Sequence, residues 1–344
     1  IDRRFKVIEF EACENALLTS SVRPLHALAR RFYFALARKP VPQVALSQAA
    51  LMEHVARADE EAALAAHDAF IDAIEKFGLR ARKRRLPGSA PDDRLDGAAA
   101  EAAAQDDPVS LSARAYRMIE QQIITGRYSE NELLTEGRLG QELGLGRTPV
   151  REALQKLASH HLVTIMPRRG VLVTDFHDFD LDMLVQARRP LEGLLCRRAA
   201  ERATLQQRGA LAAIIQPWLS AARRGDNATV MTLDREMKQL LVAAAGNVYL
   251  ADAIRPIHTL ARAIYFRHQT ITNIDVALAQ MDVLQAVVDR NVEDAGFGAL
   301  RFIAESVHAI RKSPSYRSPP ARASSSRPRR SSSSWLPQAS SESA

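Results

Sequence analysis

The chain has 344 residues, about two to three times the usual domain length, which predicts more than one domain. Its hydrophobic content of 47% and charged content of 25% are ordinary for a globular protein with real cores. No run of about 18 apolar residues occurs, which excludes an ordinary membrane-spanning helix. Two cysteines, Cys13 and Cys196, are too few for a disulfide framework, so we expect a cytoplasmic location. The start at Ile1, with neither Met nor a signal segment, suggests a fragment or a processed product.

The net charge of +7 suits a nucleic-acid partner, but much of the excess lies in two short segments. One is the basic run at 80–85 and the other is the arginine-rich stretch at 322–330. Solvated flexible charge explains both runs as well as DNA contact does. The charge therefore permits a DNA-binding function without establishing one.

The first segment of the chain, residues 1–76, repeats residues 233–308 at a constant offset of 232 and without a gap. Identical residues occupy 23 of the 76 pairs, whereas ordinary composition gives roughly 7% per pair. Examples are Asn15 with Asn247 and His26 with His258. An ungapped match of this length indicates a duplication.

Both copies have apolar residues at helical spacing, as in Ile254, Ile257 and Ile264 of the second copy. Residues 1–78 are therefore predicted to form part of a helical bundle that lacks the helices needed to close a core. We expect this partial bundle to pack on a missing upstream part or on the second copy. Residues 79–108, which contain the basic run and Pro87-Gly88-Ser89, are predicted to be a linker, with a short helix near 98–104.

Residues 109–175 follow a different pattern, which we call the winged module. A helix is predicted from Ser112 to Thr125 and a short one from Glu136 to Leu143. After the turn Gly144-Leu145-Gly146, a third helix is predicted to open at Thr148-Pro149, with Thr as its cap and Pro in its first position. Two extended runs, 162–165 and 171–174, then flank a basic hairpin tip, which we call the wing.

Helix, helix, turn, helix and hairpin is the order of a winged helix-turn-helix. The third helix buries an apolar stripe that includes Val150 and Leu157, so the opposite face can enter a major groove. Solvated surface charge remains the alternative, and it explains Arg138 equally well. The candidate DNA-binding residues are Arg138, Arg147, Thr148, Pro149, Arg151, Arg168, Arg169 and Gly170.

The stretch Gly144-Leu145-Gly146-Arg147-Thr148-Pro149-Val150-Arg151-Glu152-Ala153-Leu154 resembles the recognition-helix signature of GntR-family bacterial transcription regulators. The wing sequence Pro167-Arg168-Arg169-Gly170-Val171 also resembles that family. The resemblance implies double-stranded DNA as a partner. One departure is Gly146, where the family usually has Ser or Thr, and the missing hydroxyl is expected to weaken affinity modestly.

Residues 179–312 are predicted to form a bundle of about six helices, and residues 313–344, rich in Ser, Pro and Arg, to be disordered. The bundle resembles the effector-binding FCD-type domain of the FadR-like branch of the family. We therefore expect a mainly α protein. It would contain a winged helix-turn-helix domain, an all-α effector-binding and dimerisation bundle, and a partial second bundle upstream.

Many FadR-like effector domains hold a divalent metal with an Asp, a His four residues later and two further His. At the matching positions this chain has Asp234, Lys238, Gln280 and Phe302. The first copy has the same residue types, in Asp2, Lys6, Gln48 and Phe70. An ammonium, an amide and a phenyl ring cannot replace three imidazoles, so no metal and no cofactor are predicted.

These positions instead predict a cavity for a small anionic or polar metabolite. The candidate effector-binding residues are Arg188, Asp234, Lys238, Arg262 and Gln280. The alternative is that Asp234 and Lys238 form a structural (i, i+4) ion pair and that Phe302 fills the cavity. His258 and His26 lie beside apolar stripes, which is typical of packed histidines.

The favoured interpretation is a ligand-responsive transcription repressor whose operator affinity changes when the effector binds. A homodimer or an intramolecular pseudo-dimer of the two bundles would read a pseudo-palindromic operator. An enzyme is not expected, because no catalytic arrangement of Ser, His, Asp or Cys is apparent. The alternative is a helical scaffold or oligomerisation protein with lost or weak DNA binding.

Overall fold

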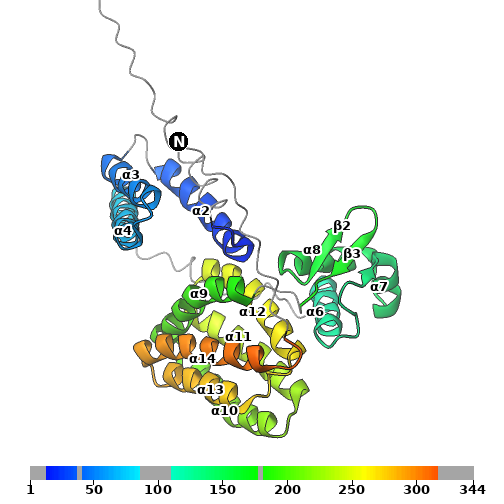
Figure 1. The fold of residues 1–344 in the computed structure, drawn as a ribbon. Coiled ribbons are helices and arrows are strands. Elements are labelled where there is room, and N and C mark those ends of the chain that lie inside the picture. Colours follow the sequence, from blue (N-terminus) through cyan, green and yellow to red (C-terminus); the bar gives the residue numbers. More distant parts are fainter. Residues whose placement is uncertain (1–12, 37–40, 86–109, 177–180, 317–344) are drawn as a thin grey trace, which may run out of the picture.

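A computed structural model describes residues 13–36, 41–85, 110–176 and 181–316, and the fold is mainly α, as predicted. The winged module lies beside the bundle (Figure 1), and buried side chains of both parts belong to one continuous hydrophobic core. Within the described ranges, no helix combines the length and apolar character needed to cross a membrane. The short helix expected near 98–104 lies outside the described residues.

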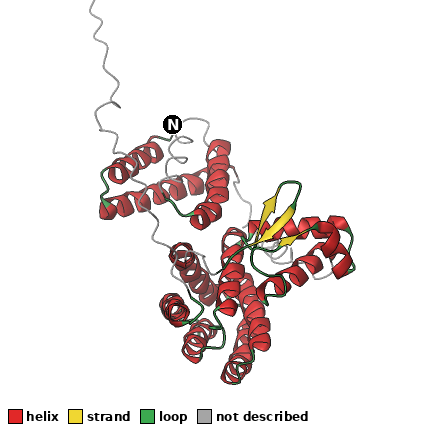
Figure 2. Ribbon diagram, turned by 45° about the vertical axis from the view of Figure 1, so that its right-hand side comes forward, coloured by secondary structure: helices red, strands yellow, loops and turns green. Residues whose placement is uncertain are grey.

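The winged module contains three helices and a small sheet of three antiparallel strands in the order β1-β3-β2 (Figure 2). Its elements are α6 (Leu111–Ile124), β1 (Leu133–Leu134), α7 (Glu136–Leu143), α8 (Arg147–Ser159), β2 (Val163–Met166) and β3 (Gly170–Val173). Capping explains where the first two helices begin, because the side chains of Ser110 and Thr135 each accept a backbone N–H from the first turn. Gly144, in a left-handed conformation, ends α7.

The start of α8 differs from the expectation. Thr148 was predicted to be the cap, but the helix already begins at Arg147 and Gly146 is the N-cap residue. Gly146 has extended backbone angles (φ −66°, ψ 162°) and supplies no side-chain acceptor. The amides of the first turn therefore lack a side-chain cap, and such a helix end suits an anion.

The wing is closed by two residues with positive φ, Arg168 (64°) and Gly170 (122°). A Cβ atom on Gly170 would lie 2.2 Å from the carbonyl oxygen of Leu134 in β1. Glycine is therefore required here so that β3 can pack against β1. This packing role accounts for Gly170 without a contact to DNA.

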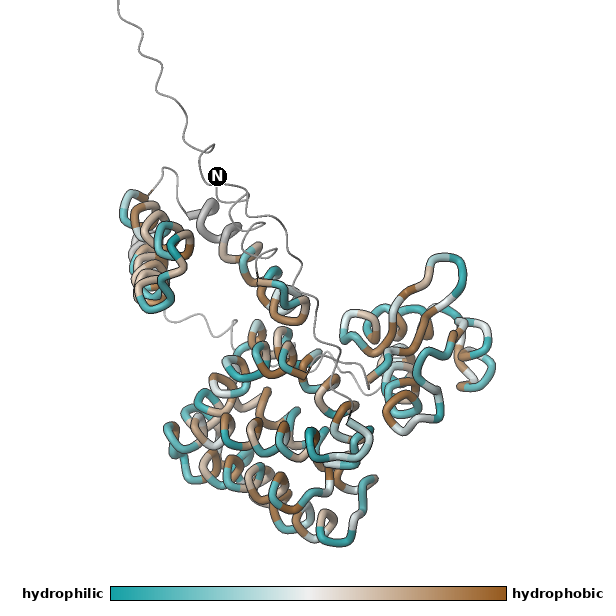
Figure 3. The backbone as a smooth tube through the Cα atoms, in the orientation of Figure 1, coloured by the Kyte–Doolittle hydropathy of each residue, from teal (hydrophilic) through white to brown (hydrophobic). Residues whose placement is uncertain are grey.

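The bundle contains six helices, as the apolar spacing predicted. They are α9 (Leu181–Arg202), α10 (Leu205–Arg223), α11 (Asn227–Ala245), α12 (Val248–Arg267), α13 (Ile274–Val288) and α14 (Val292–Lys312). Helix α9 packs against α11, α12, α13 and α14, which places it at the centre. Hydrophobic and hydrophilic residues alternate along the bundle helices (Figure 3), as expected where each helix has a buried face.

Ahead of the winged module, the described residues form three helices: α2 (Ala16–Leu36), α3 (Pro42–Ala56) and α4 (Glu60–Arg85). Helices α3 and α4 pack together, and α2 contacts α9 and α12 of the bundle (Figure 1). Helix α4 continues through the basic run to Arg85, so the linker predicted from residue 79 starts later than expected. At the other end, residues 313–316, which were predicted to be disordered, have a described structure, and the ring of Tyr316 meets His268 edge-on.

Candidate nucleic-acid interface and ligand site

The recognition helix α8 has one buried face and one exposed face. Val150 and Leu157 are fully buried in the core of the winged module, whereas Arg147, Thr148 and Arg151 are exposed. The helix thus presents two guanidinium groups near its uncapped N-terminus, where a groove would receive them.

Arg151 is paired across the surface with Glu136, the first residue of α7. Its Nε and Nη2 atoms each donate to one carboxylate oxygen, at 2.8 Å. This contact lowers the pKa of Glu136, with the hydrogen bond from Arg151 as the main cause. The Arg151 side chain nevertheless stays 61% exposed. Exposed pairs of this kind are weak, so a phosphate or a guanine edge can compete for the guanidinium.

Arg138 in α7 is held more firmly than the sequence indicated. Its Nη1 atom lies 2.6 Å from Glu132, and its Nε atom lies 2.7 Å from Glu142. Glu142 also accepts a hydrogen bond from Tyr128, and burial together with this carboxylate raises the pKa of Tyr128 to about 12. A DNA contact by Arg138 would have to displace two carboxylates.

Arg168 and Arg169 are exposed at the tip of the wing, as the hairpin pattern indicated. Figure 2 shows that this hairpin projects from the helices of the module. A projecting basic tip can reach a neighbouring groove or the phosphate backbone.

Inside the bundle, the carboxylate of Glu192 organises the predicted effector residues. Glu192, in α9, is fully buried and is met by three nitrogen groups. Lys238 Nζ lies 2.8 Å from Oε1, while Arg188 Nε and His258 Nε2 lie 2.9 and 3.0 Å from Oε2. A buried charge needs such partners.

The pKa shifts of this cluster follow from burial and from these contacts. Burial alone would raise the pKa of Glu192, but Lys238, His258 and Arg188 together hold it well below its usual range. Burial lowers the pKa of His258, and the attraction of Glu192 only partly opposes this effect. Glu192 is therefore a carboxylate at neutral pH, while burial favours the neutral imidazole of His258.

The space around this cluster is filled by its own side chains. Arg188 and Lys238 lie over the ring of Phe302, with 5.1 and 5.3 Å from the charged group to the ring centroid. Gln280 Oε1 lies 3.5 Å from Lys238 Nζ. Within the described part of the chain, no group of three or more His, Cys, Asp or Glu side chains could hold a metal ion.

The (i, i+4) ion pair of Asp234 with Lys238, which was the alternative to a ligand cavity, does not form. Lys238 reaches inward to Glu192, and Asp234 instead accepts a hydrogen bond of 3.0 Å from Arg262 Nε. The physical reason is that a fully buried carboxylate gains more from the ammonium than the partly exposed Asp234 does.

A second ion-pair cluster connects the bundle to the winged module. Glu120 of α6 is buried, and its Oε2 atom lies 2.7 Å from Arg235 Nη2 of α11. Its Oε1 atom lies 3.5 Å from Arg262 Nη1 of α12. The hydroxyl of Tyr116 donates to Glu120 and lies 2.8 Å from Nδ1 of His160, the residue that ends α8. The recognition helix is thus connected to α11 and α12 through polar contacts.

A pocket of about 360 Å³ opens between these two parts of the protein, and we call it the interdomain pocket. Lys238, His258 and Arg262 line it from the bundle, and Arg117 and Lys156 line it from α6 and α8. Its lining includes six Lys or Arg side chains against two Glu side chains. Arg262 Nη1 is buried there without a hydrogen bond. This excess of positive charge favours an anion.

The predicted effector residues therefore fall into three places. Lys238 and Arg262 line the interdomain pocket, and Asp234 holds Arg262 in position. Arg188 and Gln280 lie behind them in the filled cluster around Glu192. The sequence did not indicate that the open space beside these residues lies on the side of the winged module.

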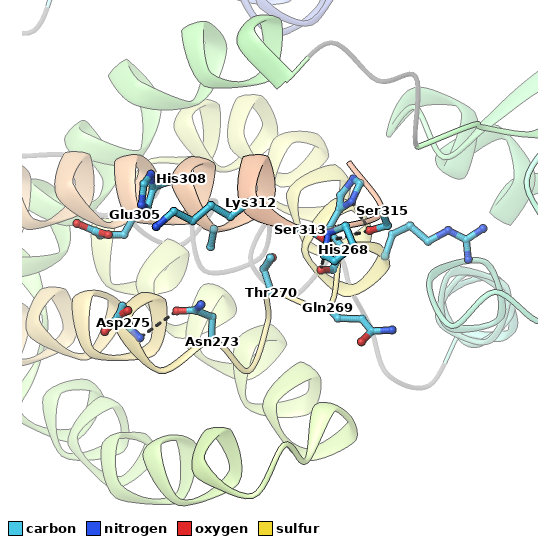
Figure 4. A pocket seen from close by; sticks show the side chains of 13 residues that line it. His268, Gln269, Thr270, Asn273, Asp275, Glu305, His308, Lys312, Ser313 and Ser315 are labelled. Atoms are coloured by element: carbon cyan, nitrogen blue, oxygen red, sulfur yellow. Dashed lines mark hydrogen bonds between the residues drawn. The ribbon is translucent and has the colours of Figure 1, made fainter. Parts of the chain in front are cut away.

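A larger pocket, of about 610 Å³, lies at the C-terminal ends of α12 and α14 (Figure 4). Its charged side chains are of both signs, since Asp275 and Glu305 lie among His308 and Lys312. Because both signs are present, the pocket favours neither an anion nor a cation. None of the predicted effector residues lines it.

Comparisons with known proteins agree with the geometry. Residues 111–173 match the bacterial regulatory proteins of the gntR family, and residues 183–303 match the FCD domain. The chain belongs to the GntR family.

Three relatives place this GntR-family chain among transcription regulators. It is 28% identical over 207 residues to the HTH-type transcriptional repressor RspR of Escherichia coli. The matched region covers 59% of this chain and 91% of RspR. It is 24% identical to the uncharacterized HTH-type transcriptional regulator YdhC of Bacillus subtilis, over 45% of this chain and 70% of YdhC. It is 27% identical to the E. coli regulator McbR, over 43% of this chain and 67% of McbR. The matched domains and relatives are regulators and not enzymes.

Two important acidic residues were missed by sequence reasoning. Glu192 lies four residues after Arg188, and this helical spacing could have identified it. Glu120 lies in the winged module of the GntR-family chain, and no spacing rule connects it to arginines more than a hundred residues away. Only the packing of α6 against α12 reveals that contact.

Replacing Glu192 tests the buried cluster. Glu192→Gln leaves Arg188 and Lys238 buried without their carboxylate, so we expect the free energy of unfolding to fall by about 3–5 kcal/mol. Urea denaturation followed by circular dichroism measures the loss, and adding Lys238→Met to this variant should recover part of it. The matched control is Glu201→Gln, which removes the carboxylate of an exposed pair with Arg198. Equal stability of Glu192→Gln and the control would contradict the proposed role of the cluster.

Proposed function

We propose that this GntR-family regulator is a repressor that binds a pseudo-palindromic DNA operator and is controlled by a small anionic metabolite. The observation that carries the DNA-binding part is the exposed pair Arg147 and Arg151 on a helix whose opposite face is fully buried. The repressor role is supported by the similarity to RspR, which is described as a repressor.

The proposed DNA contacts divide by chemistry. Arg147 and Arg151 reach base edges or phosphates in the major groove, and the uncapped first turn of α8, which holds Thr148 and Pro149, faces a phosphate. Arg168 and Arg169 contact the backbone or the minor groove from the wing. Gly170 shapes the wing and Arg138 stabilises α7, so neither is needed for base recognition.

The proposed effector site is the interdomain pocket. A carboxylate or phosphate group there would meet Arg262 and Arg235, the two cations that now hold Glu120. An incoming anion competes with Glu120 for the same nitrogen atoms. Lys238 and Lys156 add positive charge to the pocket from either side.

This competition supplies a mechanism for regulation. When Glu120 loses its arginines, the winged module loses its polar connection to α11 and α12, and the hydrogen bond between Tyr116 and His160 at the end of α8 is disturbed. The orientation of α8 relative to the bundle then changes, and operator affinity changes with it. A ligand acts in this way only if it binds the two arrangements with different affinity.

A helical scaffold without DNA binding is the second candidate function. The observation that favours it is the bidentate contact of Arg151 with Glu136, which occupies the guanidinium in the free protein. The two candidates differ in whether operator binding depends on Arg151.

The Arg151→Ala variant tests the DNA-binding proposal. A bidentate base contact contributes about 1–3 kcal/mol of discrimination, so operator affinity should fall about 5- to 150-fold. Fluorescence anisotropy with DNA fragments selected by binding to the wild type measures the loss at fixed salt. Arg198→Ala, which removes an exposed arginine from the bundle, is the control. Unchanged binding by Arg151→Ala, or binding by the wild type without sequence preference, would favour the scaffold.

A thermal-shift screen of the full chain with dicarboxylates, sugar acids and sugar phosphates tests the interdomain pocket. A ligand at 100 times its Kd stabilises by about 2.7 kcal/mol, which raises Tm by several degrees. Arg235→Gln and Lys156→Gln should reduce the shift, while Lys312→Gln, in the larger pocket, should leave it unchanged. Equal shifts in all three variants, or equal stabilisation by neutral sugars, would contradict an anion site between the domains.

A further inference from the structure

The three upstream helices correspond to the last three helices of the bundle. Shifted by the repeat offset of 232, α2 begins at the first residue of α12, α3 coincides with α13 at both ends, and α4 begins at the first residue of α14. The caps correspond as well. Asn15 accepts the amide of Leu18 at 2.9 Å, and Asn247 accepts the amide of Leu250 at 3.1 Å.

Helix α2 meets α12 through equivalent residues. The Ser21 hydroxyl donates to the carbonyl oxygen of Ala253, 3.4 Å away and 232 positions later in the chain. The groove between these helices is lined by Pro24 on one side and by its equivalent, Pro256, on the other. In a two-fold interface, the residues nearest the axis meet their own copies. The contact between α2 and α12 therefore has the form of an isologous dimer interface.

The upstream helix is also firmly attached to the bundle. Leu17 is only 3% exposed and belongs to the main hydrophobic core. The side-chain amide of Asn15 (Nδ2) donates to the backbone carbonyl oxygen of Met183 and to the side-chain oxygen of Gln186. Both acceptors lie in α9, at 3.0 Å. These contacts bury polar and apolar groups together, as a specific interface does.

We propose that the upstream segment takes, within one chain, the position that a second copy of the bundle would take in a homodimer. The occupant of the α12 face is then α2 of the same chain, and the face is closed to another copy. The described residues contain one winged module, so this internal pair presents one recognition helix. An operator with two half-sites would then be read by two chains that do not meet through α12.

Disulfide trapping tests this inference independently of the proposed function. The exposed Cys13 is replaced by Ser, and the buried Cys196 is kept. In this background, the double variant Ser21→Cys/Ala253→Cys brings two thiols together where α2 crosses α12. Mild oxidation should give a disulfide within one chain, seen as a single-chain mass, a loss of two free thiols and one cross-linked peptide of residues near 21 and 253.

The single variant Ala253→Cys is the matched control. If a second copy packed on α12, the introduced thiols of the two chains would lie near the two-fold axis and form a covalent dimer. We expect this variant to stay a single chain under the same oxidation. The inference is overturned if Ala253→Cys alone gives the covalent dimer, or if the double variant gives only intermolecular disulfides or none. Circular dichroism on both variants checks that they fold.

Discussion

The pairing of one buried carboxylate, Glu120, with two arginines of the bundle sets the relation between the two functional parts of this protein. Glu120 lies on the first helix of the winged module, and Arg235 and Arg262 lie on two helices of the bundle. Breaking a buried pair by removing one partner is costly, because the other charge stays behind without compensation. The winged module is therefore held against the bundle by this ion-pair cluster in addition to the shared hydrophobic core, and the proposed effector anion would compete for the same arginines.

The neighbouring cluster around Glu192 explains why this bundle differs from the metal-binding pattern implied by its family resemblance. Lys238 and Gln280 lie at positions where that pattern has histidines, and the Lys238 ammonium is neutralised by Glu192. The ammonium group of Lys238 thus supplies, at this position, the positive charge that a metal ion would otherwise bring. Lys238 also borders the interdomain pocket, so the buried cluster and the proposed anion site share one cation.

Much of the fold could be predicted from the sequence because its signals are local. Helix α7 was predicted with both ends correct, since Thr135 caps its start and Gly144 adopts the left-handed conformation that ends it. The start of α8 was misplaced by two residues, because a glycine N-cap leaves no side-chain signal. The six bundle helices followed from apolar spacing, which depends only on neighbouring residues.

The site was less predictable because its contacts are distant in sequence. The family resemblance suggested one cavity for Arg188, Lys238 and Gln280, and the structure places them around Glu192, a residue that the resemblance did not indicate. The chain separates Glu120 from Arg235 by 115 positions, and no periodicity reports such a contact. Likewise, the repeat predicted that the upstream helices pack somewhere, while the crossing of α2 over α12 at equivalent residues needed the three-dimensional fold.

A double-mutant cycle on operator affinity tests the connection between the domains most directly. It compares the wild type with Glu120→Gln, Arg235→Gln and the double variant, using fluorescence anisotropy at fixed salt. If this ion pair sets the placement of the recognition helix, either single change already removes the pair, and the two effects will fail to add by about 0.5–3 kcal/mol. Effects that add to within about 0.3–0.5 kcal/mol would show that Glu120 and Arg235 act separately and would contradict the account.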